Sequence, residues 1–417
     1  MSAVQQCPPV PSPGIGSGLP GIGSGLLDSW FDGYAAAVNG FGRCFTTALR
    51  RGPGALDFPR WIATATRRTP PSWSTPHEIV FEAPLARLRD FSVSGKRIVP
   101  TLVLPPQAGH DSCIVDYSPA QSQMGAILDA GLERAFSLDW IGATRETKDA
   151  SIEDYMDLVD RAVEHCGGRV NLIGDCQGGW LATIYAALHP ERVNTLTIAG
   201  APIDFHAGEP VIHEVLRRVA PDGDLRFYEA LVAMGGGVLQ GRHMLAGFIM
   251  IQPGAEIARQ IDLLLNLDDP AHVARYREFE DWFKHTQDFP GAFYLWIVRH
   301  LFRDNGLIGR SLEVRGKKVD LATIDMPLNL MAGAVDHITP PDQVFALATH
   351  ASTPPEHVTR HVSTGGHLGL FMGHEALREH WPRVLTDVFQ HSRAGSYRQT
   401  TRSKGEVDGR SHAASQG

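Results

Sequence analysis

The sequence Val170-Asn-Leu-Ile-Gly-Asp-Cys-Gln-Gly-Gly-Trp180 joins an apolar segment to a cysteine that has glycines two positions before and after it. The apolar residues predict a strand, and the pattern that begins near Leu181 predicts a helix. Glycine at positions 174 and 178 permits a sharp turn between the two, where a β-carbon would collide with the neighbouring backbone. The pattern is typical of a nucleophile elbow with Cys176, in place of the usual serine, at its apex.

This position favours a reactive thiol. At the N-terminus of a helix, the helix dipole and the free N–H groups favour the thiolate of Cys176 over the thiol, and the thiolate is the species that attacks carbonyl carbons. The alternative is a buried, inert cysteine at a tight turn. A catalytic interpretation therefore requires a base and an acid elsewhere in the chain.

The composition is that of a globular enzyme. With 417 residues, of which 43% are hydrophobic and 20% charged, the chain is long enough for one large α/β core and an inserted subdomain. The net charge of −8 disfavours nucleic acid as a partner. The five cysteines are an odd number without regular spacing, which argues against a disulfide framework and fits a reducing cytoplasm. The sequence has no C-x-x-C or H-E-x-x-H motif, so we expect no metal site.

The hydropathy pattern bears on the cellular location. No apolar run approaches the roughly 18 residues of a transmembrane helix, and the N-terminus has no basic-then-apolar signal pattern. We therefore expect a protein that is neither secreted nor membrane-spanning.

The two ends of the chain differ from its middle. Residues 1–27 repeat the sequence Gly-Ile-Gly-Ser-Gly-Leu and are rich in Pro and Gly, which predicts disorder. Residues 391–417 are polar and basic and are expected to form a disordered tail. Residues 28–74 predict an amphipathic helical segment, whose apolar residues recur on one helix face: Tyr34, Val38, Phe41, Phe45 and Leu49. This face fits a helix that docks on the main domain, or one that binds a partner subunit or an apolar particle surface.

The remaining segment, 75–390, predicts the catalytic domain. Short apolar runs alternate with helical patterns, which implies a mostly parallel sheet with helices on both faces. Between about residues 205 and 321 the alternation is replaced by a long helical stretch, which we interpret as a cap inserted after the sixth strand of an α/β-hydrolase sheet. The predicted strands are 78–81, 98–104, 113–117, 135–140, 170–173, 195–198, 328–331 and 358–362.

Two loops offer the acid and the base in the order that α/β hydrolases use, in which the nucleophile comes first and the histidine last. Asp336 follows the buried strand 328–331, and His367 follows the strand 358–362 within Gly365-Gly-His-Leu-Gly369. His337 and His374 compete with His367, and Asp336 could instead cap a turn. Order, strand-end position and glycine context favour Cys176, Asp336 and His367 as a catalytic triad.

Several motifs along the chain together match a known enzyme family. They are Gly174-Asp-Cys-Gln-Gly-Gly179, Ala187-Leu-His-Pro-Glu-Arg-Val, Pro202-Ile-Asp-Phe205, Leu138-Asp-Trp-Ile-Gly142, Gly316-Lys-Lys-Val-Asp-Leu321, Met326-Pro327, Asp336-His-Ile-Thr-Pro-Pro341 and Gly365-Gly-His-Leu-Gly369. In these motifs the chain resembles the polyhydroxyalkanoate synthases, most closely the short catalytic subunit of two-component synthases. The resemblance extends over about residues 75–390, and is strongest around the three catalytic loops. A poorly characterised hydrolase-like branch related to these synthases shares the elbow and the upstream residues Asp116 to Gly125.

The resemblance implies acyl transfer through a cysteine thioester. The substrate would be a 3-hydroxyacyl-CoA, with no permanently bound cofactor, and the product a polyester. His367 would take the thiol proton, and both it and Asp336 would help activate the hydroxyl of the incoming chain. We expect the backbone N–H of Gln177 to hold the oxyanion, with a second N–H near Ser118 in the loop after the predicted strand 113–117. Ser118 could instead belong to a simple turn.

The resemblance also implies partners and a location. We expect a cytoplasmic or granule-associated enzyme, with a homodimer or a second synthase subunit bound through the N-terminal helix. An aromatic-rich cap fits an apolar acyl tunnel or ordinary helix packing. The cap aromatics are Phe248, Trp282, Phe283, Phe289, Phe293, Tyr294 and Trp296.

Two residues depart from the synthase pattern, which usually has an apolar residue before the nucleophile and a small one after the glycine pair. Asp175 places a carboxyl beside the thiol and opposes thiolate formation unless it is turned away or paired, for example with Arg145, Arg161 or Arg169. Trp180 is bulky. Two alternatives therefore stay open: a hydrolase, either a thioesterase or a polyhydroxyalkanoate depolymerase, and a non-catalytic relative that binds acyl chains or a partner.

Overall fold

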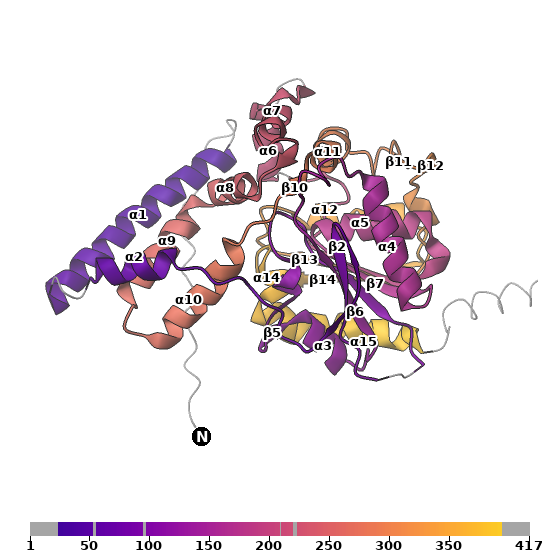
Figure 1. Cartoon of the computed structure of the whole chain (residues 1–417), viewed down its shortest axis with the longest axis horizontal. Helices are drawn as coiled ribbons and strands as arrows, with labels where there is room; N and C mark the ends of the chain where they lie inside the picture. The colour runs from indigo at the N-terminus through magenta and orange to yellow at the C-terminus, as the bar shows by residue number, and fades with distance from the viewer. Residues whose placement is uncertain (1–23, 53–55, 95–96, 209, 220–222, 394–417) are drawn as a thin grey trace, which may run out of the picture.

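The computed structural model describes residues 24–52, 56–94, 97–208, 210–219 and 223–393 (Figure 1). Most of the expected N-terminal disordered segment, residues 1–23, and of the C-terminal tail, residues 394–417, therefore lies outside the described residues.

A central sheet of eight strands organises the main domain. Its spatial order is β1-β2-β6-β3-β7-β8-β13-β14, and only β2 runs antiparallel to its neighbours. This topology is that of the α/β-hydrolase fold, so the expected fold class is confirmed. The strands are β1 (Glu78–Ala83), β2 (Ala86–Asp90), β3 (Thr101–Leu104), β6 (Ala135–Trp140), β7 (Val170–Asp175), β8 (Val193–Ala199), β13 (Leu328–Gly333) and β14 (Val358–Ser363).

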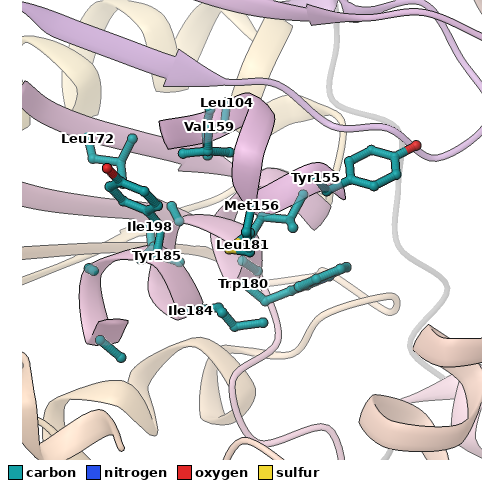
Figure 2. Packing of buried hydrophobic residues seen from close by; sticks show 14 of the residues in the cluster. Leu104, Tyr155, Met156, Val159, Leu172, Trp180, Leu181, Ile184, Tyr185 and Ile198 are labelled. Atoms are coloured by element: carbon teal, nitrogen blue, oxygen red, sulfur yellow. The ribbon is translucent and has the colours of Figure 1, made fainter. Parts of the chain in front are cut away.

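Alternate residues of each buried strand point to opposite sides, so both faces of this sheet carry apolar side chains. Helices cover both faces. On β7, Leu172 contributes to the core beneath α4 and α5, whereas Ile173 contributes to the core beneath α3, α14 and α15. Figure 2 shows the first of these cores, in which Leu172, Leu181 and Ile198 pack together. The helices are α3 (Gln123–Asp129), α4 (Ile152–Cys166), α5 (Gln177–Leu188), α12 (Pro341–Phe345), α13 (Leu347–His350), α14 (Gly369–Met372) and α15 (Trp381–Ser392).

The prediction of a strand at 113–117 was wrong for residues 113–115. Residues Ser112–Val115 form a 3-10 helix, and Asp116–Ser118 (β4) pairs only with Gln121–Ser122 (β5) in a separate two-stranded ladder. Burial explains why this 3-10 helix was predicted as a strand, because Cys113, Ile114 and Val115 are as buried as the residues of a central strand would be. The prediction also missed β2.

A mainly helical segment lies between the sixth and seventh strands of the sheet, β8 and β13. It stands over the end of the sheet at which α5 begins (Figure 1). Short antiparallel ladders, β9 with β10 and β11 with β12, brace this segment. Its elements are α6 (Val211–Val219), α7 (Arg226–Met234), β9 (Val238–Leu239), α8 (Gly241–Ile251), α9 (Pro253–Leu265), α10 (Pro270–Phe283), β10 (Phe289–Pro290), α11 (Gly291–Trp296), a π-helix (Ile297–Arg303), β11 (Glu313–Val314) and β12 (Lys317–Lys318).

The N-terminal helices α1 (Ser24–Arg51) and α2 (Phe58–Thr66) pack on this helical segment rather than on the sheet. Helix α1 lies along α9, and Arg43 forms an ion pair of 2.8 Å with Asp262. Gly40 makes the contact close, because a β-carbon there would lie 1.9 Å from Cδ1 of Ile261. Helix α1 thus docks through small residues, and the predicted apolar face points the other way: Tyr34, Val38, Phe41, Phe45 and Leu49 are all exposed.

Candidate active site

Cys176 lies at the turn between β7 and α5 with φ 50° and ψ −117°, a backbone conformation that a residue with a β-carbon rarely adopts. Gly178 is required two residues later, because a β-carbon there would lie 1.9 Å from the carbonyl oxygen of Leu104. The turn is therefore pressed against the end of β3. Its geometry is that of a nucleophile elbow, which presents the side chain of Cys176 above the sheet.

The side chains of His367 and Asp336 are in contact, although the two residues are 31 positions apart in the sequence. The Nδ1 atom of His367 lies 2.7 Å from Oδ2 of Asp336. The other carboxylate oxygen, Oδ1, accepts the backbone N–H groups of Ile338 and Thr339, each at 2.9 Å. Since these bonds fix the carboxylate, it fixes in turn the tautomer and the orientation of the imidazole.

Cys176 completes this arrangement. Burial by itself lowers the pKa of His367, but the negative charges of Cys176 and Asp336, together with hydrogen bonds to both side chains, raise this pKa well above its usual value. The structure thus brings Cys176, His367 and Asp336 together in one chain of contacts. The competing histidines, His337 and His374, are exposed.

Asp175, the first departure from the synthase pattern, is completely buried at the end of β7. Its Oδ1 atom lies 3.5 Å from Nε2 of Gln123, and its Oδ2 atom has no hydrogen-bond partner among the described residues. Burial raises the pKa of Asp175 to about 8. The raised pKa favours the neutral carboxyl near pH 7, and in that form Asp175 places no negative charge beside Cys176.

Trp180, the second departure, lies in α5 and is buried. Its ring packs 6.1 Å from that of Phe293 and 6.3 Å from that of Trp296, both from α11. Figure 2 shows Trp180 beside Leu181 and Ile184 of the same helix. A bulky residue is accommodated here because it fills the space between α5 and the cap.

Two cavities meet at Cys176. The first, of about 310 Å³, extends between α8, α9 and α10 and is also lined by His367 and Asp336. The second, of about 210 Å³, extends toward α6, α7 and the π-helix. Cys176, Ala108, Phe248 and Ile338 line both. The thiol therefore lies at the junction of these two cavities, which are also called the first and the second chamber below.

The two chambers differ in character. The second is largely apolar, and its lining includes Trp180, Phe205, Leu216, Tyr294, Ile297, Val298 and Phe302. The first has a charged wall formed by Glu256 and Arg259 of α9. Arg259 also pairs with Glu280 at 2.7 Å, and Lys284 bonds to both carboxylates, at 2.8 Å to Glu256 and at 2.6 Å to Glu280. The buried charges are thus neutralised within the cap.

The predicted oxyanion donors do not both lie at this junction. Gln177 lines the second cavity next to Cys176, and it begins α5. Ser118 lines neither cavity and belongs to the β4–β5 ladder. Because the presumed strand before Ser118 is a 3-10 helix, the loop that reaches the elbow is instead the one after β3, which contributes Ala108 to both cavities. Sequence reasoning missed this loop, although the apolar run 98–104 predicted the strand before it.

Sequence reasoning also missed His110 and Gln123. The ring of His110 stacks on those of Trp282 and Phe283 in the first cavity, with centroid distances of 5.0 and 5.3 Å. Burial lowers the pKa of His110 to about 4, so its imidazole is neutral.

Within the described parts of the chain, no group of three His, Cys, Asp or Glu side chains is placed to hold a metal ion. No described helix has the length and apolarity to cross a membrane.

The sheet order and the elbow define this chain as an α/β-hydrolase-fold protein with cysteine at the nucleophile position. A family model described as "Protein of unknown function (DUF3141)" matches residues 86–386, and the chain belongs to that family.

Sequence comparison also confirms the resemblance to the polyhydroxyalkanoate synthases. The chain is 27% identical to the poly(3-hydroxyalkanoate) polymerase subunit PhaC of Allochromatium vinosum over 281 residues, which are 65% of this chain and 75% of the relative. With the subunit of the same name from Haloferax mediterranei it shares 25% identity, over 77% of this chain and 65% of the relative. Among solved structures, a monoacylglycerol lipase of Paleococcus ferrophilus is 18% identical with a TM-score of 0.44, over 74% of this chain and 99% of the lipase chain.

Proposed function

We propose that this chain is a cysteine acyltransferase that takes the acyl group of a 3-hydroxyacyl-CoA and transfers it to the hydroxyl of a growing polyester. The observation that carries the proposal is the contact chain from Asp336 through His367 to Cys176 at the elbow. The names of the related polymerase subunits support the choice of reaction and substrate.

The first half-reaction charges the enzyme. The thiolate of Cys176 attacks the thioester carbonyl carbon, and His367 keeps the proton that the thiol has lost. When the tetrahedral intermediate collapses, the bond to the CoA sulfur breaks, and His367 gives its proton to that sulfur. The products are an acyl-cysteine and free CoA, which is a nearly isoenergetic exchange of one thioester for another.

The second half-reaction extends the chain. His367, neutral again and oriented by Asp336, accepts the proton of an incoming hydroxyl, whose oxygen attacks the carbonyl carbon of the acyl-cysteine. An ester bond forms, the bond to Sγ of Cys176 breaks, and the resulting thiolate faces the protonated imidazole. The thiolate–imidazolium pair is thereby regenerated.

We also propose the residues that hold the oxyanion in both steps. The backbone N–H of Gln177 at the start of α5 is one donor. The other comes from the loop after β3, at Ala108, rather than from Ser118. Support for Ala108 comes from its position beside Cys176 in both cavities.

The two chambers suit the two halves of the substrate. The charged wall at Glu256 and Arg259 suits the polar CoA portion, and the apolar second chamber suits the acyl chain. An apolar acyl chamber disfavours attack by water on the acyl-cysteine, and so favours transfer over hydrolysis. We place this activity in the cytoplasm or at a granule surface, in a catalytic domain of residues 75–390 whose cap is residues 205–321.

Product analysis tests this proposal against hydrolysis. Incubation of the full chain with 3-hydroxybutyryl-CoA should release CoA and leave oligomers that persist after the protein is removed. If free hydroxy acid is the sole product, the protein is a hydrolase that uses the same three residues. The matched control is Cys176→Ala, which should release no CoA.

A non-catalytic role is tested by labelling. Iodoacetamide near neutral pH should modify Cys176 faster than the other described cysteines, because Cys113 and Cys166 are buried and burial raises the pKa of Cys44, which is also partly exposed. Absence of selective labelling at Cys176 would favour a protein that only binds acyl chains or a partner.

A further inference from the structure

His110 lies in the loop after β3, two residues beyond Ala108, which lines both chambers. Its imidazole is buried, and aromatic rings of the cap surround it. The rings of Trp282 and Phe283 stack on the imidazole at interplanar angles of 27° and 13°, and the centroid of the Phe248 ring lies 5.7 Å away. These contacts fix the orientation of the His110 side chain.

The imidazole of His110 is neutral and therefore carries one proton. Burial lowers its pKa to about 4, although the backbone carbonyls of Ala108 and Phe283 act in the opposite direction. The Nδ1 atom lies 3.1 Å from the backbone oxygen of Ala108, whereas the Nε2 atom has no hydrogen-bond partner among the described residues. Because a carbonyl oxygen can only accept, the geometry assigns the proton to Nδ1, which donates to Ala108.

This hydrogen bond restrains the residue that we propose as the second oxyanion donor. The accepting oxygen belongs to Ala108 itself, so a rotation of Ala108 about its own backbone bonds would break the hydrogen bond. No backbone carbonyl among the described residues accepts the N–H of Ala108, which leaves that N–H available to a ligand. Donors of this kind stabilise a transition state only when they are held in place before the negative charge develops.

The backbone on either side of Ala108 is held by other parts of the protein. The carbonyl of Pro105 accepts the indole N–H of Trp140 at 2.9 Å, and the carbonyl of Gly109 accepts the backbone N–H of Gln287 at 2.8 Å. Loss of the bond from His110 should therefore loosen residue 108 while its neighbours stay in place. The expected effect is local, on the site, and not on the stability of the fold.

We propose that His110 is a positioning residue for acyl transfer, which holds the backbone of Ala108 through Nδ1 so that the N–H of Ala108 reaches the oxyanion. This inference rests on the proposed function, and specifically on Ala108 as the second oxyanion donor. It assigns no proton transfer to His110, which is distinct in this respect from His367.

Three substitutions in the full chain separate the hydrogen bond from the aromatic ring. His110→Phe keeps a ring against Trp282 and Phe283 but removes the donor. His110→Asn loses the ring, but its side-chain amide can donate from nearly the position of Nδ1, whereas the longer amide of His110→Gln lies nearer to the position of Nε2. His285→Phe is the matched control, because His285 is an exposed histidine of the cap that lines neither chamber.

The rate of CoA release over a range of 3-hydroxybutyryl-CoA concentrations gives kcat and KM for each variant. His110→Phe should lower kcat by roughly 10- to 100-fold and leave KM within about twofold, because the oxyanion donor acts on the transition state and not on the bound substrate. His110→Asn should recover most of kcat, and His110→Gln should not. The Tm of His110→Phe should not fall below that of the wild type, since the phenyl ring also removes a buried nitrogen that has no partner.

A wild-type kcat for His110→Phe would overturn the inference and leave the proposed function in place. Equal losses in the Phe and Asn variants, recovery by Gln in place of Asn, or a loss of kcat that follows a loss of Tm would overturn it as well. Absence of CoA release by the wild type would remove the proposed function, and this inference with it.

Discussion

The Nδ1 atom of His367 lies 2.7 Å from Oδ2 of Asp336, and the other oxygen of that carboxylate accepts two backbone N–H groups. Asp336 can therefore neither rotate away nor bind a different partner without losing three hydrogen bonds. The position of the imidazole beside Cys176 depends on this carboxylate.

Asp336→Asn should lower the rate of CoA release from 3-hydroxybutyryl-CoA by roughly 10² to 10⁴ fold, because the amide can hold the imidazole in the wrong tautomer. Stopped-time assays of CoA release measure the change. Asp342→Asn, at an exposed carboxylate in the same region, is the matched control and should stay near the wild-type rate. Near-native turnover of Asp336→Asn would remove Asp336 from the mechanism.

Replacement of Cys176 by Ala should lower the pKa of His367. The raised pKa depends on the thiolate charge, and once that charge is removed burial opposes protonation with only Asp336 to offset it. Nitrogen-detected NMR titration of the histidines measures this shift, with the exposed His374 as an internal reference. An unchanged pKa would mean that Cys176 and His367 do not interact.

Asp175→Asn should keep most of the activity at pH 7, because the carboxyl that it replaces is already mostly neutral there. Burial raises the folded-state pKa of Asp175 to about 8, so the wild type loses stability as the pH rises from the unfolded pKa to that value. Thermal unfolding should show a Tm for Asp175→Asn that is several °C above that of the wild type. This difference in Tm should grow over this pH range and then level off. Asp149→Asn, at an exposed carboxylate, should show no such trend.

Leu216→Trp should shift the substrate preference toward short acyl chains. Leu216 of α6 is buried and lines the second chamber, so a larger side chain would fill space that the proposed acyl chain occupies. We expect the ratio of kcat/KM for 3-hydroxyoctanoyl-CoA over 3-hydroxybutyryl-CoA to fall by roughly tenfold or more. Met234→Trp, at an exposed site on α7, is the control. If both substrates slow equally, the acyl chain does not enter this chamber.

The sheet and the three loops of the site could be predicted because their signals are local. Glycines around Cys176, and strand ends before Asp336 and His367, are visible in short segments. The conformation of residues 113–115, on which the expectation for Ser118 rested, could not be predicted, because this buried apolar run satisfies the pattern of a strand while forming a 3-10 helix. Burial alone does not distinguish these two conformations.

The sequence pattern could not predict the orientation of α1 either. Its periodicity identified the apolar face but not whether that face turns inward. In the fold, the close approach of Gly40 to Ile261 determines which face of α1 turns inward, since a helix packs most closely through its smallest side chains. That contact depends on α9, more than 200 residues along the chain.

Mass spectrometry of the peptide that contains Cys176 tests most directly whether this residue carries the acyl group. After brief incubation of the full chain with 3-hydroxybutyryl-CoA and acid quenching, we predict a hydroxybutyryl group on Cys176 and on no other cysteine. CoA release without acylation of Cys176, or near-native release by Cys176→Ala, would contradict the account.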